Sequence, residues 1–171
     1  MTAMTYSEFD PQSFTNIQTG CYQLILKLDQ TISLEIGALC RLTLKPGIYL
    51  YTGRHRKSLL ARISRHLKKE KSVYWHIDYF TVHPAIKAEN VIIFPETDAE
   101  CKINLDFHHL FNTRFLYRGL GSGDCKNKCV AHMQFIQNLS DKDINIWLAT
   151  QAVFKPVFFS VNYSKLKEIH A

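Results

Sequence analysis

The chain has 171 residues, of which 46% are hydrophobic and 21% are charged, so it suits one globular domain with a sizeable core rather than a disordered chain. No apolar run is long enough to span a bilayer, and we expect no membrane partner. Residues 1–14 lack the basic and then apolar layout of a secretory signal, and five cysteines are an odd number for a disulfide framework. We therefore expect a cytoplasmic protein whose thiols are reduced or bind a metal.

The net charge of +6 is concentrated in one segment of the chain. Residues 54–71 contain eight lysines and arginines and the single acid Glu70, whereas the rest of the chain is slightly negative. A local basic segment of this kind is typical of proteins that bind polyanions, although a solvated helix surface is the alternative interpretation. The candidate nucleic-acid contacts are Arg54, Arg56, Lys57, Arg65, Lys68 and Lys69.

Alternating apolar residues predict strands in the first third of the chain. A strand is expected over residues 21–28, opened by Gly20, and a hairpin over residues 32–44. A further strand over residues 48–53 follows the Pro46-Gly47 turn. We expect these strands to form an antiparallel meander.

Helical periodicity follows directly. Ser58 can cap a helix that continues to about residue 69, with an apolar stripe beside a stripe formed by Arg62, Arg65, His66 and Lys69. The geometry of an α-helix places Arg62 and His66 at the rim of the apolar stripe, where the helix meets the sheet. The further predicted elements are a helix over 73–82, a buried strand over 91–94, a helix over 97–111, strand composition over 153–163 and a last helical turn over 164–171.

These elements predict a single α/β (α+β) domain in which an antiparallel sheet is flanked by helices. We expect residues 1–19 to form a loosely attached N-terminal arm and residues 20–138 to form the main domain. Residues 139–171 are expected to be a C-terminal extension that packs on the same domain.

Five short motifs occur in order between Gly20 and about Met133. They are Gly20-Cys21-Tyr22 with Tyr51-Thr52-Gly53 in the run from Gly47 to Gly53, then Leu59-x-x-Arg62-x-x-x-His66, then Trp75-His76-Ile77-Asp78-Tyr79, then Glu100-Cys101, and a loop from Gly121 to His132. The individual motifs are weak, but their order is specific. Together they resemble the GIY-YIG endonuclease superfamily, and most closely its Uri-type subfamily.

The resemblance implies an endonuclease that hydrolyses phosphodiester bonds with one Mg²⁺ or Mn²⁺ ion. It implies that Tyr22 is the candidate base, that Tyr51 and His66 orient water or phosphate, and that Glu100 binds the metal. Arg62 offers a fixed set of donors that suits phosphate oxygens, which fits this chemistry. The chain departs from the family pattern at Thr52 and Arg54-His55, and it has no identifiable counterpart of the family's late asparagine.

Several of these residues also have ordinary structural interpretations. Tyr22 is in phase with Leu24 and Leu26, so it can be a packed core tyrosine, and Arg62 can be a surface arginine. Trp75 is expected in the core, whereas His76 and Asp78 either brace the site or contact substrate. For His66, a structural role and a role in the reaction are equally favoured.

Glu100 has the clearest alternative. Thr97-x-x-Glu100 matches a capping box, in which the glutamate accepts a hydrogen bond from the cap residue's own N–H. A glutamate used in this way is not free to bind a metal, so the two interpretations compete. The position of Glu100 among the ordered motifs favours the metal.

Cys125, Cys129 and His132, together with Cys101, supply four side chains of the type that bind zinc. Free buried thiols are the alternative, because the spacing is looser than in a paired Cys-x-x-Cys motif. The glycines at 119, 121 and 123 lack the Gly-Lys-Ser/Thr ending of a phosphate-binding P-loop.

The sequence therefore predicts a metal-dependent endonuclease that acts on nucleic acid, with DNA favoured over RNA. The principal alternative is a non-catalytic nucleic-acid-binding module on the same fold. A third interpretation is a zinc-stabilised interaction protein whose basic segment binds partners.

Overall fold

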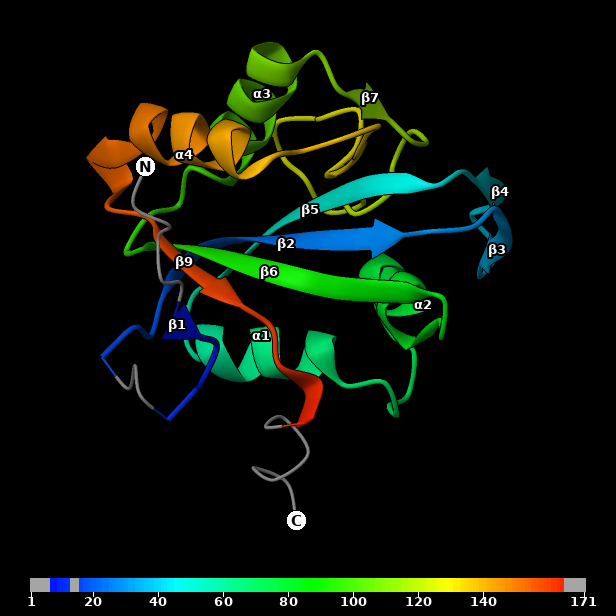
Figure 1. The fold of residues 1–171 in the computed structure, drawn as a ribbon, viewed down its shortest axis with the longest axis horizontal. Coiled ribbons are helices and arrows are strands. Elements are labelled where there is room, and N and C mark those ends of the chain that lie inside the picture. Colours follow the sequence, from blue (N-terminus) through cyan, green and yellow to red (C-terminus); the bar gives the residue numbers. More distant parts are fainter. Residues whose placement is uncertain (1–6, 13–15, 165–171) are drawn as a thin grey trace.

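The computed structural model describes residues 7–12 and 16–164, which form one α+β domain (Figure 1). The strands are β1 (Ser7–Glu8), β2 (Gly20–Leu28), β3 (Ile32–Ile36), β4 (Cys40–Leu44), β5 (Gly47–His55), β6 (Ile86–Pro95), β7 (Arg114–Phe115), β8 (Met133–Ile136) and β9 (Val157–Ser160). The helices are α1 (Leu59–Leu67), α2 (His76–Val82), α3 (Glu100–Phe111) and α4 (Asp141–Thr150), and a 3₁₀ turn, η1, covers Ala152–Phe154. Within this part of the chain no helix is long and apolar enough to cross a membrane.

A sheet of seven strands forms the centre of the domain, in the order β1-β9-β6-β2-β5-β8-β7. The central strand β2 pairs antiparallel with β5 on one side and with β6 on the other. Apart from the parallel β1–β9 pair, all neighbours in this sheet are antiparallel. The predicted antiparallel sheet flanked by helices is therefore confirmed.

The predicted meander is wrong, although its strands form. The hairpin β3–β4 makes a separate two-stranded sheet, so the chain leaves the main sheet after β2 and returns with β5 directly beside β2. Leu34, Ile36 and Leu44 of the hairpin join the core, which explains why its alternating pattern is so clear.

Helices cover both faces of the main sheet, α1 and α2 on one face and α3 and α4 on the other (Figure 1). Leu24 and Leu26 of β2 pack in the core on the α1 side, whereas Cys21 and Ile25 pack in the core on the α3 side. Burial on both faces makes β2 almost wholly inaccessible, as expected for a central strand between two helical layers. Strand β2 therefore places Tyr22 on the α1 side of the sheet.

The helices begin and end differently from the sequence-based expectation. Ser58 occupies the N-cap position of α1 but its side chain makes no capping hydrogen bond, and α1 ends at Leu67. Helix α2 begins three residues later than predicted, and α3 begins at Glu100 instead of Thr97. Helix α4 was not predicted, although Ser140 and Asp143 form a capping box at its start.

Both ends of the described chain join the sheet. In the predicted N-terminal arm, β1 pairs with β9, and the buried Phe9 packs edge-to-face on Phe159. The predicted C-terminal extension supplies β9, next to β6, and α4, whose buried Trp147 donates a hydrogen bond to Gln23 of β2 at 2.8 Å. The arm is thus anchored at Phe9. Residues 165–171 of the predicted last helical turn lie outside the described residues.

Candidate functional site

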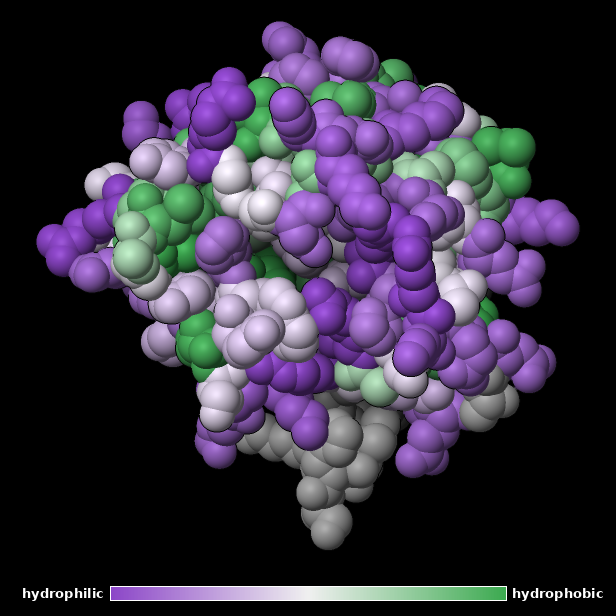
Figure 2. Space-filling view, turned by 180° about the vertical axis from the view of Figure 1, so that it is seen from behind, coloured by the Kyte–Doolittle hydropathy of each residue, from purple (hydrophilic) through white to green (hydrophobic). Residues whose placement is uncertain are grey.

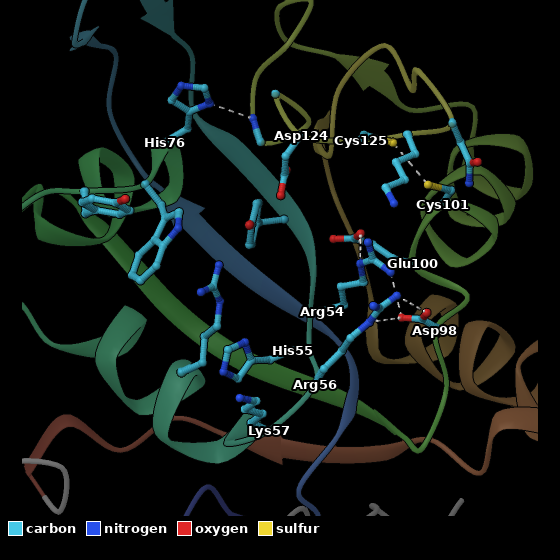
Figure 3. A pocket seen from close by; sticks show the side chains of 18 residues that line it. Arg54, His55, Arg56, Lys57, His76, Asp98, Glu100, Cys101, Asp124 and Cys125 are labelled. Atoms are coloured by element: carbon cyan, nitrogen blue, oxygen red, sulfur yellow. Dashed lines mark hydrogen bonds and ion pairs between the residues drawn. The ribbon is translucent and has the colours of Figure 1, made fainter.

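A cleft of about 880 Å³ opens on the face of the molecule shown in Figure 2, where most side chains are hydrophilic. Its walls come from the end of β5, the start of α1, the segment before α2, the start of α3 and the loop 121–127 (Figure 3). Many of the predicted site residues line this cleft. They are Tyr51, Arg54, Arg56, Lys57, Arg62, Trp75, His76, Glu100, Cys101 and Cys125.

Tyr22, His66 and Asp78 do not line the cleft and are wholly buried behind its wall. The ring of Tyr22 lies 6.1 Å from that of Tyr51 and 6.0 Å from that of His66. The four predicted catalytic side chains are therefore neighbours, but only Tyr51 and Arg62 face the cleft.

Gly53 makes room for Tyr22. The two residues are direct partners across the antiparallel β2–β5 pair. A Cβ atom on Gly53 would lie 2.6 Å from the Tyr22 hydroxyl oxygen, far inside normal contact distance. The glycine of the Tyr51-Thr52-Gly53 motif is thus required by sterics, because the tyrosine of the first motif lies directly on it.

The hydroxyl of Tyr22 is buried and makes no hydrogen bond of good geometry among the described residues, although Arg62 and Tyr51 lie close enough to lower its pKa. Burial raises the pKa of Tyr22 to about 12, although the neighbouring Arg62 guanidinium favours the ionised form. Burial also raises the pKa of Tyr51 well above its ordinary value, and the adjacent Tyr22 and Glu100 add to this rise. Both tyrosines are therefore neutral phenols at neutral pH in this structure.

The buried carboxylate of Asp78 determines the state of His66. Burial alone would raise the pKa of Asp78, but hydrogen bonds from His66, from the backbone of Trp75 and from Arg65 hold it well below its usual range. Asp78 is therefore ionised and can only accept, so His66 Nδ1, 3.1 Å from Asp78 Oδ1, carries the proton. His66 Nε2 is then a bare acceptor, and it is buried without a partner among the described residues.

Trp75 lies on the cleft wall, half-buried, and not wholly in the core as predicted. The guanidinium groups of Arg62 and Arg65 lie 4.1 and 4.3 Å from its ring centre, which are favourable cation–π distances. His76 Nδ1 accepts a hydrogen bond from the backbone N–H of Gly121 at 3.1 Å (Figure 3). Trp75 thus holds Arg62, and His76 joins the start of α2 to the late loop.

The capping-box interpretation of Glu100 is wrong. Helix α3 has Ala99 at its N-cap without a side-chain capping bond, and the Thr97 hydroxyl accepts from the N–H of Ala99. Glu100 is the first residue of the helix, and its carboxylate contacts side chains instead. Its Oε2 lies 3.1 Å from Arg54 Nε, and its Oε1 lies 3.4 Å from His132 Nδ1.

The basic segment is divided between the cleft and the interior. Arg65 forms an ion pair with buried Asp78 at 2.9 Å, and Lys69 donates to the backbone carbonyls of His83 and Ile86. Lys71 donates to backbone and to Thr81. Exposed Arg56 and Lys57 line the cleft, whereas Lys68, the exposed residue that follows α1, lies outside it. Arg65 and Lys69, which were predicted to contact nucleic acid, therefore already make structural contacts within the domain.

The predicted zinc-type residues lie together at one end of the cleft. The ligand atoms of Cys101, Cys125, Cys129 and His132 are all within 4.8 Å of one another, so the cluster could hold a metal ion such as zinc. Cys101 Sγ lies 3.4 Å from Cys125 Sγ (Figure 3). Burial would raise the pKa of Cys125, but hydrogen bonds from the backbone of Cys129 and from Cys101 lower it to about 7.

Sequence reasoning missed several residues that line the cleft, among them Tyr74, Asp98 and Lys126. Asp98 accepts from Arg54 at 2.8 Å and from Arg56 at 2.7 Å, so it holds both arginines at the cleft edge. Lys126 lies between two of the predicted zinc ligands in the sequence, and this position could have indicated that it lies near the site. Tyr74 adjoins the Trp75 motif, and its ring lies 4.8 Å from that of Trp75.

Replacing Gly53 should disturb Tyr22 directly. We expect Gly53→Ala to lower the free energy of unfolding by about 1–3 kcal/mol, because the new methyl group overlaps a rigid buried ring. Gly123→Ala is the matched control, since a Cβ there meets nothing within 4 Å, and it should stay within about 0.5 kcal/mol of wild type. Urea unfolding measures both variants. Equal stabilities would show that Tyr22 does not require this glycine.

The buried neutral state of His66 predicts a pH dependence. Burial lowers the pKa of His66 to about 4, so the unfolded chain, with a value near 6.5, binds more protons between these two values. Stability should therefore fall as pH falls from about 6.5 to about 4, by on the order of 3 kcal/mol from this group. His66→Gln should remove that component in urea titrations at several pH values, whereas His109→Gln on the exposed side of α3 should keep it. A His66→Gln profile with the wild-type slope would contradict the assignment.

Comparisons with known proteins identify a family. No curated protein and no solved structure shows significant similarity to the chain. The sequence model of a family described as a domain of unknown function, DUF123, matches residues 21–153. This match spans the strands β2 to β8, helices α1 to α4 and the whole cleft. The chain therefore belongs to the DUF123 family.

Proposed function

We propose that this protein is a metal-dependent endonuclease of the GIY-YIG type, similar to its Uri-type subfamily, that hydrolyses phosphodiester bonds of nucleic acid. DNA is the preferred substrate over RNA. One observation carries the proposal. Three buried polar atoms in the described part of the chain, Tyr22 Oη, Arg62 Nε and His66 Nε2, make no hydrogen bond of good geometry, and they belong to neighbouring side chains beside a cleft that contains a carboxylate.

The energetics make this observation informative. A buried donor or acceptor without a partner costs about 1–3 kcal/mol, so folded proteins rarely retain several in one place. Arg62 is close enough to Tyr22 and to His66 to shift the pKa of each. Groups of unsatisfied polar atoms are expected where a protein has been selected to act on a ligand. A core built only for stability would have satisfied them.

The cations of the cleft fit a phosphodiester. Arg62 presents a guanidinium that Trp75 already holds in place, and a planar guanidinium can donate two hydrogen bonds to one phosphate group. Arg56, Lys57 and Lys126 are exposed at the cleft and can hold neighbouring phosphates of the backbone. Asp98 limits the freedom of Arg54 and Arg56, which reduces the entropy lost on binding.

The two tyrosines and His66 are the groups that would orient the attacking water and accept its proton. Tyr51 lines the cleft and can orient the attacking water through its hydroxyl group. Tyr22 lies behind it, and His66 Nε2 is a free acceptor in the same buried region. Because Asp78 fixes the His66 tautomer, Nε2 is an acceptor that can hold and orient a tyrosine hydroxyl or a water molecule.

Glu100 is the side chain that would hold the divalent cation. It lines the cleft, and Mg²⁺ or Mn²⁺ commonly uses one or two carboxylates together with substrate phosphates. When bound, such an ion polarises the phosphoryl oxygen and stabilises the charge that develops on it. Glu100 is not engaged in a helix cap, and its carboxylate lines the cleft, where Arg54 Nε lies 3.1 Å from Oε2.

The non-catalytic binding module on the same fold is the second candidate. The observation that favours it is the pairing of both Glu100 oxygens, one with Arg54 and the other with His132. A carboxylate neutralised in this way attracts a cation less strongly. In that case the basic cleft would bind nucleic acid without cutting it.

Glu100→Gln separates these two functions. In the endonuclease, loss of the carboxylate charge should reduce cleavage about 10²- to 10⁴-fold, because metal assistance contributes several kcal/mol to the reaction. Binding of nucleic acid should remain. The measurement is cleavage of single-stranded, duplex and branched DNA and RNA in metal-free buffer with Mg²⁺ or Mn²⁺ added.

The matched control is Asp106→Asn, the same chemical change on the same helix. Asp106 pairs with Lys102 at 2.6 Å and lies outside the cleft, so this variant should cut normally. A fully active Glu100→Gln enzyme would remove Glu100 from the reaction. If the wild-type protein binds these substrates but cuts none of them with either metal, the binding module is the function.

The salt dependence of binding tests the basic cleft. Each lysine that contacts a phosphate of duplex DNA contributes about 0.9 to the steepness of log affinity against log salt, so the Lys57→Gln, Lys126→Gln double variant should lose about 1.8. Lys142→Gln on the exposed face of α4 is the control and should keep the wild-type slope. Fluorescence anisotropy with labelled duplex reports both slopes. An unchanged slope in the double variant would show that other residues bind the phosphates.

A further inference from the structure

Three cysteines and one histidine from two distant parts of the chain come together beside the cleft. Cys101 lies in the first turn of α3, and the other three lie on the loop between β7 and β8. The cysteines are free thiols, and none of them is paired in a disulfide. Their sulfur atoms and the ring of buried His132 converge on one point.

The spacing of these atoms fits zinc. With zinc–sulfur bonds of about 2.3 Å, the sulfur atoms of a tetrahedral site lie about 3.8 Å apart. Here Cys101 Sγ lies 3.4 Å from Cys125 Sγ and 4.0 Å from His132 Nε2, and all four ligand atoms lie within 4.8 Å of one another. Three thiolates and an imidazole are a closed structural set for zinc, with no position left for water.

The loop that carries three of these ligands is anchored at its ends and exposed between them. Residues 116–132 contain no helix or strand, and loops of this length without regular structure are uncommon in a small domain. Buried Leu120 and Ala131 pack in the core, and the N–H of His132 donates to Leu120 O, whereas residues 123–130 are mostly exposed. A metal ion would join this exposed part of the loop to α3 at one point.

His132 connects this cluster to the cleft. Its Nε2 faces the cysteines, whereas its buried Nδ1 makes no hydrogen bond of good geometry among the described residues and has Glu100 Oε1 as a neighbour at 3.4 Å. A histidine that binds zinc through one nitrogen commonly gives its other N–H to a carboxylate, which fixes both side chains. The carboxylate here is the one that faces the cleft.

We propose that Cys101, Cys125, Cys129 and His132 bind one Zn²⁺ ion, and that this ion positions Glu100 through His132. The zinc site itself is independent of any activity. The second half, positioning of Glu100 for a divalent cation, rests on the proposed endonuclease function. Glu100 then has fixed partners on both oxygens, His132 on one and Arg54 on the other.

Metal analysis tests the site. Protein purified without chelators should contain about one zinc ion per chain, and after zinc removal it should take up about one Co²⁺ with the absorption of a tetrahedral thiolate site. Cys125→Ser should lose this stoichiometry. Cys40→Ser, the same change in β4 outside the cluster, should keep it. If the wild-type protein is stable without metal and takes up no Co²⁺, the site does not exist. The titration of the wild-type protein decides this even if Cys125→Ser fails to fold.

His132→Cys tests the link to Glu100. Four thiolates still bind zinc, so the variant should retain about one Co²⁺, but it has no N–H to donate to Glu100. Loss of such a second-layer contact typically costs 10–100-fold in metal affinity, so Mn²⁺ binding at Glu100, measured by electron paramagnetic resonance, should weaken by that factor. Unchanged Mn²⁺ affinity would refute the positioning role. If zinc is bound and Mn²⁺ affinity falls but no substrate is cut, only the proposed function fails.

Discussion

The buried carboxylate of Asp78 is the interaction on which one half of the site depends. An ionised carboxylate with no solvent contact is costly unless several partners compensate it. Arg65, His66 and Lys71 lie within ion-pair distance, and the N–H groups of Tyr74 and Trp75 donate to it. These partners come from α1, from the segment after it and from the start of α2. One carboxylate therefore fixes two helices against each other, and removing it would take an ion-pair partner from Arg65 and Lys71 and the hydrogen-bond acceptor from His66 Nδ1.

The cleft is built between this network and a second one. On one side, Asp78 fixes the tautomer of His66 and the start of α2, and Trp75 in turn holds Arg62. On the other side, Glu100 lies between Arg54 and His132 at the start of α3. The N–H of Gly121 joins the two sides through His76, and the same glycine packs closely on the ring of Tyr51. Each wall is thus fixed by a carboxylate, and the central strands β2 and β5 set the distance between them.

The sequence predicts the parts of this site that depend on local periodicity. It does not predict contacts that depend on residues far away in the chain. Alternation located β2, β5 and the β3–β4 hairpin, and the ordered motifs predicted that Tyr51, Arg62 and Glu100 belong together. Periodicity does not define the first residue of a helix, so a three-residue error at α3 turned Glu100 into an apparent cap. Arg65 contacts Asp78, and Lys69 contacts the backbone of His83 and Ile86. The sequence pattern around α1 does not indicate these contacts. The order of the main sheet is likewise set by long-range pairing, and α4 was missed because it buries only Ile144 and Trp147.

The high pKa of Tyr22 suggests how such a site would be controlled. A phenol with a pKa of about 12 is a poor proton acceptor at neutral pH, because almost none of it is ionised. Desolvation is the main cause of the rise and Arg62 already opposes it, so additional positive charge at the cleft would lower the pKa further. Glu100 acts in the opposite direction, since its negative charge raises the pKa of both Tyr22 and Tyr51. In the proposed endonuclease, a cation bound at Glu100 would therefore remove an unfavourable charge and add a favourable one beside the same tyrosines, so their ionisation would depend on that cation.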